Sequence, residues 1–459
     1  MLGRSSSKAE NAADTDRFDS TNGSGYDTAT AWKTVGILTI IYWFGTLDRQ
    51  LMPLLVTPIK NDLHLTDIQI GSLQSIAFSL FYTLATFPIG RLIDTHSRRA
   101  VLFTGTLFWT VTSVASGLAR SFLQMFGARA AVGAGEATIQ PASFAILADI
   151  FPAGRLTLPI SVFMLGSNLG AGCAFALGGT LFTWLEHSGI HRIPIFGEMN
   201  SWQFAFLIAG MPGIPLAFLI FAIPSARPKG LARKAATYSL TEVWMRYRKH
   251  ISFYLTHNLA FSLCSAFAVG LLAWNPALLG RRYGWELNRI GLWLGVSQIL
   301  FATIGQPIHG WIVDRMFRTG IKDAHMRYYA VICPFAGVIA ALGYLANNPY
   351  VTLLCFNLSY FLMLAFAGVG AAAVQIATPA PLRGTFSGIY QIWLGLFGGV
   401  LSALGIALIT DWVFRSEAHL GQSMAIFAAL TMSIATILFI AGLRPMRRAI
   451  EDSSVDSDE

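Results

Sequence analysis

Long apolar blocks separated by short polar segments fill most of this chain. Each block has about 20 residues or more, which is enough for an α-helix to cross the hydrocarbon core of a bilayer. Twelve such spans are expected, at 33–59, 70–93, 100–119, 122–150, 158–184, 202–224, 252–280, 289–315, 327–346, 350–375, 384–410 and 421–443. The pattern predicts an all-α membrane protein with twelve transmembrane helices.

The composition supports this prediction. Of the 459 residues, 54% are hydrophobic and 12% are charged, whereas about a quarter of the residues in soluble domains are charged. The four cysteines all fall inside apolar runs, where we expect small core residues rather than a disulfide framework.

One long polar segment divides the chain into two sets of six spans. We expect a disordered cytoplasmic tail over 1–31, a six-helix bundle over 32–224, a basic cytoplasmic linker over 225–250, a second six-helix bundle over 251–443 and an acidic tail over 444–459. With both termini in the cytoplasm, 23 Lys and Arg residues lie on that side and 7 on the other. This asymmetry favours a multi-pass protein of the cell (inner) membrane in that orientation.

A short motif recurs at an offset of 220 residues. Gly90–Asp94 is followed by Arg98 and Arg99, and Gly310–Asp314 is followed by Arg315. Repeats of this kind indicate two homologous halves, so the two bundles are expected to be pseudo-symmetric.

Four charged residues lie inside predicted spans, where charge is costly and usually functional. Asp48 and Arg49 are in span one, and Arg129 and Glu136 are in span four. Arg129 and Glu136 are seven residues apart, so they share a helix face about 10.5 Å apart along the axis. The two acids and the two bases are expected at matching depths in the membrane, so they can neutralise one another. They form either a static ion-pair network or a site for proton coupling and anion binding.

Twelve spans, the repeat and the loop Gly90–Asp94 with Arg98 and Arg99 resemble the major facilitator superfamily. The resemblance implies that two bundles rock about a central cavity. It also implies a cytoplasmic gate in which Asp94 lies near Gly384–Thr385 at the start of helix eleven. The implied gate residues are Asp94, Arg98, Arg99, Asp314 and Arg315. Alternatively, the arginines only mark the cytoplasmic side.

The Asp48-Arg49 pair and the segment Arg129–Ala137 are similar to the spinster-like branch of the superfamily. The likeness implies proton coupling by Asp48 and Glu136, and substrate binding by Arg49 and Arg129. Eukaryotic members of that branch move lysophospholipids and sphingoid phosphates. Acidic-sugar and aromatic-acid symporters of the superfamily also carry charges in helices one and four.

The second half offers amides and a tyrosine instead of charges. In the superfamily, helices one, four, seven and ten line the cavity, which selects Asn258, Asn357 and Tyr360 as further substrate-binding candidates. Hydrogen bonds between helices are the alternative for each of them.

The expected function is secondary active transport, with the proton-coupled movement of an amphipathic anion such as a lysophospholipid or sphingoid phosphate as the leading hypothesis. The alternatives are a proton symporter for a small organic anion and a multidrug-type exporter. We expect no enzyme, because the sequence has no P-loop and no nucleophile–base pair or metal cluster. The expected partners are substrate, protons and bilayer lipid. No cofactor, no metal and no nucleic acid are predicted, and the chain is expected to be a monomer.

Overall fold

A computed structural model describes residues 27–151, 157–188, 192–193, 197–224, 240–379 and 382–455 of the chain. The predicted N-terminal tail up to residue 26, most of the linker (225–239) and the last four residues lie outside the described residues. The fold is almost entirely helical, and a two-residue antiparallel pair, β1 (Arg192–Ile193) with β2 (Gly197–Glu198), accompanies the helices.

The first half contains helices α2 to α11. They are α2 (Thr28–Leu54), α3 (Val56–Leu63), α4 (Asp67–Gln74), the π-helical turn η1 (Ile76–Leu80), α5 (Phe81–Thr95), α6 (Arg98–Gly117), α7 (Phe122–Glu136), α8 (Ile139–Ile150), α9 (Thr157–Ser188), α10 (Ser201–Gly210), α11 (Gly213–Leu219) and the 3₁₀ turn η3 (Ile220–Ala222).

The second half contains α12 to α20. They are α12 (Leu240–Lys249), α13 (Ile251–Tyr283), α14 (Leu287–Arg318), α15 (Ala324–Leu345), α16 (Pro349–Met363), α17 (Phe366–Ala377), α18 (Arg383–Trp393), η5 (Leu394–Gly399), α19 (Val400–Leu408), η6 (Ile409–Phe414), η7 (Glu417–His419) and α20 (Leu420–Val455).

Among the described residues, ten helices are long and apolar enough to cross a membrane. The first and fourth predicted spans are missing from that set for identifiable reasons. α2 has sufficient length, but Lys33, Asp48 and Arg49 make it more polar. The fourth span is divided into α7 and α8 at Ala137–Thr138, and neither piece reaches 18 residues. With these two elements the arrangement is the expected twelve-helix fold.

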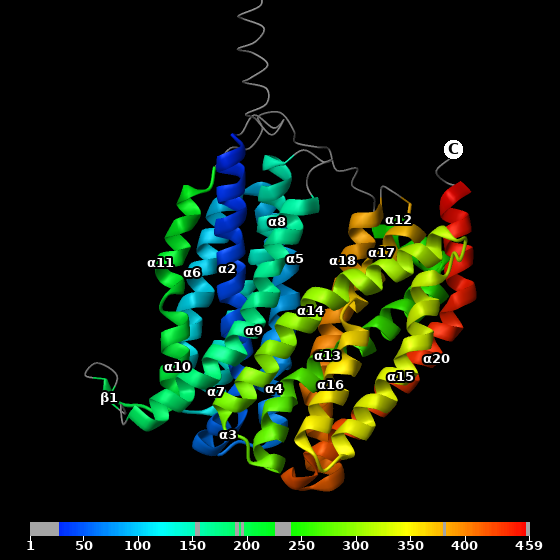
Figure 1. The fold of residues 1–459 in the computed structure, drawn as a ribbon. Helices are drawn as coiled ribbons and strands as arrows, with labels where there is room; N and C mark the ends of the chain where they lie inside the picture. The colour runs from blue at the N-terminus through cyan, green and yellow to red at the C-terminus, as the bar shows by residue number, and fades with distance from the viewer. Residues whose placement is uncertain are drawn as a thin grey trace, which may run out of the picture.

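The helices form two bundles that diverge toward one side of the molecule (Figure 1). α2 begins and α20 ends on that side, which we call the tail end. The opposite side, where α3 and β1 lie, is the distal end. The most extensive contacts between the bundles are those of α9 with α14 and of α4 with α19, and α2 also contacts α13.

Glycines bring α9 and α14 into backbone contact. A Cβ atom at Gly291 would lie 2.1 Å from the carbonyl oxygen of Phe175, and one at Gly179 would lie 2.2 Å from that of Leu287. Close packing of small residues is a main source of helix association in lipid, because apolar burial gives little driving force there.

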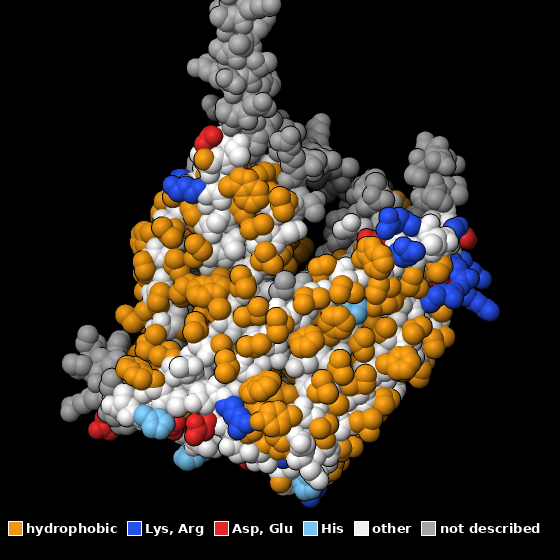
Figure 2. All heavy atoms as spheres, in the orientation of Figure 1, with side chains coloured by type: hydrophobic (Ala, Val, Ile, Leu, Met, Phe, Trp, Pro, Cys, Tyr) orange, Lys and Arg blue, Asp and Glu red, His pale blue; other side chains and the backbone are white. Residues whose placement is uncertain are grey.

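Apolar side chains cover most of the face of the molecule that Figure 2 shows, and the charged side chains gather toward its two ends. Phe87, Leu123 and Trp412 are about 70% exposed or more. A surface of this kind in water would be an interaction patch, and around transmembrane helices it is the surface that lipid contacts. The charged side chains buried inside the bundles are therefore the candidates for a functional site.

Candidate functional site

The four predicted charges lie together inside the first bundle, and we call them the charge cluster. Asp48, Arg129 and Glu136 are at most 1% exposed. Adjacent residues on a helix point about 100° apart, so Asp48 and Arg49 of α2 face different partners on α7. Those partners, Arg129 and Glu136, are about two turns apart on one face of α7.

The cluster consists of two ion pairs. The Arg49 guanidinium donates to Glu136 Oε2 from Nη2 at 2.7 Å and from Nε at 3.1 Å. Arg129 Nη1 lies 3.5 Å from Asp48 Oδ2. The Ser113 hydroxyl of α6 donates a short hydrogen bond to Asp48 Oδ1. Two acids and two bases therefore balance in charge within a largely buried site.

The two pairs differ in access and in hydrogen bonding. The Arg49 side chain is 33% exposed, whereas that of Arg129 is 2% exposed. Glu136 Oε1, Asp48 Oδ2 and Arg129 Nε and Nη1 are buried without a hydrogen-bond partner. Buried polar groups are nearly always satisfied in proteins, so the carboxylate oxygens can still accept a proton or a hydrogen bond, and the Arg129 nitrogens can still donate to water or an anion.

Phe78 is a site residue that the sequence pattern did not reveal. Its ring lies under both guanidinium groups, 4.9 Å from Arg49 Cζ and 5.9 Å from Arg129 Cζ. It belongs to η1, and π-helical turns are frequent at functional sites. A Cβ at Gly133 would lie 2.5 Å from the Phe78 carbonyl oxygen, so glycine at 133 is what allows η1 to approach α7. The other missed residue, Ser113, looks in sequence like any helical serine.

The candidates from the second half do not join the charge cluster through any hydrogen bond within the described part of the chain. Asn258 Oδ1 lies 3.0 Å from His257 Nδ1. The Tyr360 hydroxyl donates to Gln298 Oε1 at 3.3 Å. Asn357 Oδ1 is buried without a partner. Asn258 and Tyr360 thus have local partners, and Asn357 retains an open acceptor.

The predicted gate residues have contacts within their own bundles. Arg98 pairs with Asp149 and donates to the Ala145 carbonyl at 2.6 Å, and Arg99 donates to the Ile223 carbonyl at 3.2 Å. These contacts connect α6 to α8 and to the end of the sixth span.

The remaining gate residues are exposed or lie outside the description. Asp314 and Arg315 are exposed at the tail end of α14. The side chain of Asp94 lies outside what the structure describes.

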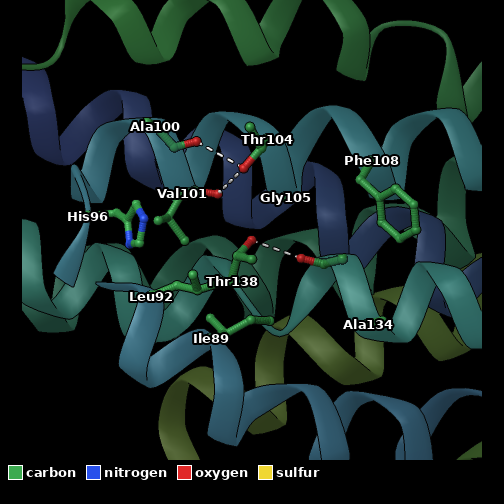
Figure 3. A pocket seen from close by; sticks show the side chains of 11 residues that line it. Ile89, Leu92, His96, Ala100, Val101, Thr104, Gly105, Phe108, Ala134 and Thr138 are labelled. Carbon is green, nitrogen blue, oxygen red and sulfur yellow. Dashed lines mark hydrogen bonds between the residues drawn. The ribbon is translucent and has the colours of Figure 1, made fainter. Parts of the chain in front are cut away.

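A groove of about 500 Å³ lies beside the charge cluster but is not lined by it. Its walls come from α5, α6 and the junction of α7 with α8 (Figure 3). The Thr104 and Thr138 hydroxyls in its lining donate to backbone carbonyls of their own helices. The lining of the groove is mostly apolar, with His96 as its titratable side chain, so we place the candidate site at the charge cluster, where four charges meet.

The charge cluster consists of two acids and two bases and does not have the composition of a metal centre. Among the described residues, no group of three or more His, Cys, Asp or Glu side chains could hold a metal ion. A guanidinium with partial exposure is a suitable ligand for a carboxylate or phosphate. A buried carboxylate beside it can accept the proton that compensates for the added charge.

Three comparisons with known proteins agree with this architecture. Residues 38–395 match the family model of the Major Facilitator Superfamily. An MFS-type efflux pump of Mycolicibacterium smegmatis is 25% identical, over 92% of this chain and 95% of the relative. The D-galactonate transporter of Escherichia coli O6:H1 is 22% identical, over 88% and 95% respectively.

Spinster proteins are also similar to this chain. Protein spinster homolog 3 of Danio rerio is 27% identical over 55% of this chain and 48% of the relative. The crystal structure of a bacterial homologue of the human lysosomal transporter Spinster, inward-facing and unoccupied, superposes with a TM-score of 0.74 at 19% identity. That superposition covers 94% of this chain and 99% of the other.

The predicted twelve-helix fold and the predicted family are both confirmed, and relatives and fold neighbours are transporters rather than enzymes. Two pseudo-symmetric bundles, a charged interior in the first and a family match over most of the length lead to one conclusion: this chain belongs to the major facilitator superfamily, as a multi-pass membrane transporter with spinster proteins among its relatives.

Proposed function

We propose that the protein is a proton-coupled transporter of an organic anion, and that the Arg49–Glu136 pair is where anion and proton are exchanged. The observation that carries the proposal is the asymmetry of this pair. Arg49 is one-third exposed, while Glu136 is buried and has a free oxygen. An incoming anion that binds the Nε–Nη2 edge of the guanidinium has to compete with that carboxylate.

Charge balance then supplies the coupling. The charge cluster is neutral as it stands, with two acids and two bases. An anion bound to Arg49 would leave an excess negative charge in a low-dielectric interior, which is strongly unfavourable. Protonation of Glu136 restores neutrality and releases Arg49 for the anion. A monovalent anion therefore requires one proton, and a dianion such as a phosphate monoester also requires protonation of Asp48.

Two classes of anion fit this scheme. An amphipathic anion, such as a lysophospholipid or sphingoid phosphate, is supported by the likeness to spinster proteins. A hydroxylated acid is supported by the likeness to the D-galactonate transporter. In either case the headgroup would bind Arg49 and Arg129. Asn258, Asn357 and Tyr360 are the proposed contacts from the second bundle.

Transport in proteoliposomes tests both the coupling and the class of substrate. Purified protein would be assayed with a pH gradient, using galactonate and hexuronate in one arm and a lysophosphatidate or sphingoid phosphate in the other. The parent should accumulate one class against its gradient. Glu136→Gln should lose accumulation but retain exchange of labelled for unlabelled substrate, because the amide mimics the protonated acid and leaves Arg49 available.

The matched control is Glu186→Gln, which changes an exposed glutamate at the end of α9. It should transport like the parent. If Glu136→Gln still accumulates substrate under a pH gradient, proton exchange does not occur at this carboxylate. If neither class of anion is transported, the exporter function of the mycobacterial relative becomes the leading alternative.

We also propose that both termini lie in the cytoplasm, and that Asp94, Arg98, Arg99, Asp314 and Arg315 form the cytoplasmic gate. The excess of Lys and Arg toward the tail end supports this orientation. Labelling of single cysteines from outside the cell is the test. A cysteine at Asn61 should react with an impermeant reagent, and one at Thr319 should not. The reverse pattern would invert the orientation.

A further inference from the structure

Three aromatic rings and one arginine form a compact group at the distal end. Arg289 lies in the first turn of α14, and its guanidinium carbon is 4.2 Å from the centre of the Trp285 ring and 5.9 Å from that of Tyr350. The Trp293 ring lies 5.9 Å from that of Tyr350 and 6.5 Å from that of Trp285, measured between ring centres. We call these four residues the aromatic–arginine cluster.

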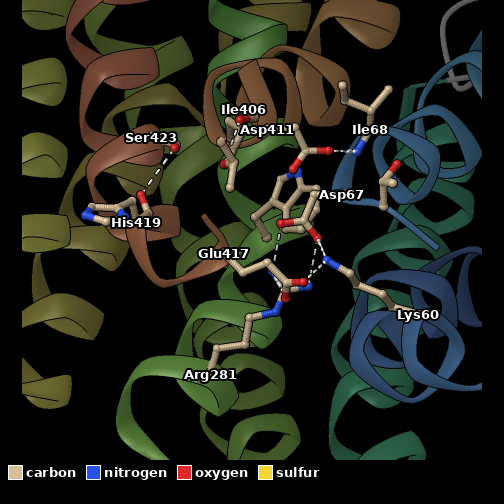
Figure 4. A network of polar contacts seen from close by, with 12 residues as sticks. Lys60, Asp67, Ile68, Arg281, Ile406, Asp411, Glu417, His419 and Ser423 are labelled. Atoms are coloured by element: carbon tan, nitrogen blue, oxygen red, sulfur yellow. Dashed lines mark hydrogen bonds and ion pairs between the residues drawn. The ribbon is translucent and has the colours of Figure 1, made fainter. Parts of the chain in front are cut away.

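Arg289 differs from the neighbouring cations of the distal end. Lys60 and Arg281 both pair with Asp67 in the ion network between the bundles (Figure 4). Arg282 donates to backbone carbonyls of its own bundle. Within the part of the chain that the structure describes, Arg289 has no carboxylate partner and donates one side-chain hydrogen bond, which goes to a neutral hydroxyl. Its positive charge is therefore available to an external anion.

The cluster orients the guanidinium but leaves most of its donors unused. Arg289 Nη2 donates to the Tyr350 hydroxyl at 2.6 Å, and the faces of the rings attract a cation. These contacts restrict the side chain before any ligand binds, which lowers the entropy cost of binding. An arginine has five N–H donors in a planar fork that fits two phosphate oxygens at once. Because Arg289 is exposed, the remaining donors can serve such a group.

An apolar surface continues from the cluster toward the middle of the membrane. Residues three, four and seven positions after Arg289 share its face of α14, and residues four and eight positions after Tyr350 share its face of α16. All five of these side chains are apolar and between 43% and 58% exposed: Leu292, Trp293, Val296, Leu354 and Leu358. Because α14 contacts α16 and Arg289 contacts Tyr350, the two faces start side by side at the cluster.

We propose that the aromatic–arginine cluster binds the phosphate of a phospholipid in the leaflet at the distal end, while the acyl chains of that lipid lie along the exposed faces of α14 and α16. Tryptophan and tyrosine are typical of the membrane–water interface, at the level of the lipid headgroups. A free phosphate ion would use the guanidinium but none of the apolar surface. A lipid without a phosphate would use the apolar surface but not the guanidinium. A phospholipid is the ligand that uses both.

Photolabelling of the full chain in a non-ionic detergent tests this proposal. Two probes carry the same acyl chains with a photoactivatable diazirine: phosphatidylglycerol, and diacylglycerol, which has no phosphate. In the parent, phosphatidylglycerol should label the segments 292–300 and 351–358 more strongly than diacylglycerol does. Arg289→Gln should lower this labelling by phosphatidylglycerol about fivefold, the effect of one basic side chain on an anionic lipid. Labelling by diacylglycerol should stay unchanged.

Arg282→Gln is the matched control, because it removes an arginine of the same end that already donates to backbone carbonyls. It should be labelled like the parent. Arg289→Lys keeps the charge without the planar fork, and its labelling should lie between those of the parent and Arg289→Gln. Elution of each variant as a single species in size-exclusion chromatography verifies that it is folded.

Parent-like labelling of a folded Arg289→Gln by phosphatidylglycerol would overturn the site. Equal labelling of the parent by the two probes would overturn it as well, because the face would then hold acyl chains without recognising a phosphate. Loss of labelling on addition of inorganic phosphate would assign the cluster to a free anion instead of a lipid. A dimer that Arg289→Gln separates into monomers would assign the cluster to a second copy of the chain, again against the proposal. No transport is measured, so the result does not depend on the proposed function.

Discussion

The contact between α9 and α14 should control which conformation this transporter prefers, and Gly291→Ala tests it. A Cβ at Gly291 would meet the backbone oxygen of Phe175 at 2.1 Å, which falls 1.3 Å short of the 3.4 Å where ordinary contact begins. A backbone atom cannot rotate away as a flexible side chain can. The two helices must therefore separate, and they belong to different bundles.

The expected magnitude follows from the cost of overpacking a well-packed interface, about 1–3 kcal/mol. A conformation in which α9 and α14 are separated at Gly291 does not carry this free-energy cost of overpacking. The ratio of open to closed populations at the distal end should therefore rise by about 5- to 150-fold. Alanine has a higher helix propensity than glycine, by about 1 kcal/mol. A change in helix propensity would therefore stabilise α14 and cannot by itself produce this opening.

Gly310→Ala on the same helix is the matched control, because nothing lies within 4 Å of a Cβ at that position. Spin labels on cysteines introduced at the exposed positions Asn61 and Ala418, after replacement of the four native cysteines, would report the open and closed populations at the distal end. Exchange of labelled for unlabelled substrate would report turnover. Gly310→Ala should leave the distance distribution unchanged. If Gly291→Ala also leaves it unchanged while the protein is folded, the α9–α14 contact does not hold the distal end closed.

Three further predictions concern the charge cluster and the tail end. Ser113→Ala removes the hydroxyl that donates to Asp48. The pH optimum of uptake should therefore change, and the free energy of unfolding should fall by about 1.5–3 kcal/mol, the range for a hydrogen bond to a charged group. Uptake measured over a series of pH values and unfolding midpoints in detergent check the two effects. Phe78→Leu removes the ring beneath both guanidinium groups. It should raise the half-saturating substrate concentration more than it lowers the maximal rate of transport. An unchanged half-saturating concentration would show that the ring does not support anion binding. Burial raises the pKa of the Asp323 carboxyl, but hydrogen bonds from two arginines, including Arg447 at 2.8 Å, outweigh it and hold that pKa below its usual value. The stabilisation is therefore present above about pH 3.9 and is lost as the pH falls through the lower pKa of the folded state. Asp323→Asn should be less stable than the parent at neutral pH, and the two proteins should become equally stable in acid. Unfolding midpoints measured over a series of pH values check this.

The sequence alone determined the twelve spans and the position of charge along them. Apolar runs of sufficient length have one stable solution in lipid, a helix whose backbone groups are satisfied internally. A charge inside such a run is rare and therefore conspicuous, which is why Asp48, Arg49, Arg129 and Glu136 could be selected without coordinates. The helical period also predicted that Arg129 and Glu136 share one face.

The tertiary structure decided which charges meet. Arg49 and Glu136 are 87 residues apart, and their pairing depends on the rotation and depth of two separate helices. Phe78 reaches the charge cluster because of the η1 turn and the small residue at Gly133, a packing relation between helices that hydropathy does not encode. Local sequence patterns report burial and periodicity, whereas such contacts depend on the whole bundle.

Four charged residues at the distal end show the same limit most clearly. In sequence, Lys60 and Arg281 are simply charges at helix ends, and Asp67 and Glu417 are ordinary acids near loops. Only the closure of two bundles against each other places them in one square and buries Asp67. Their burial and pairing belong to an interface between halves of the chain, and no segment of the sequence contains that interface by itself.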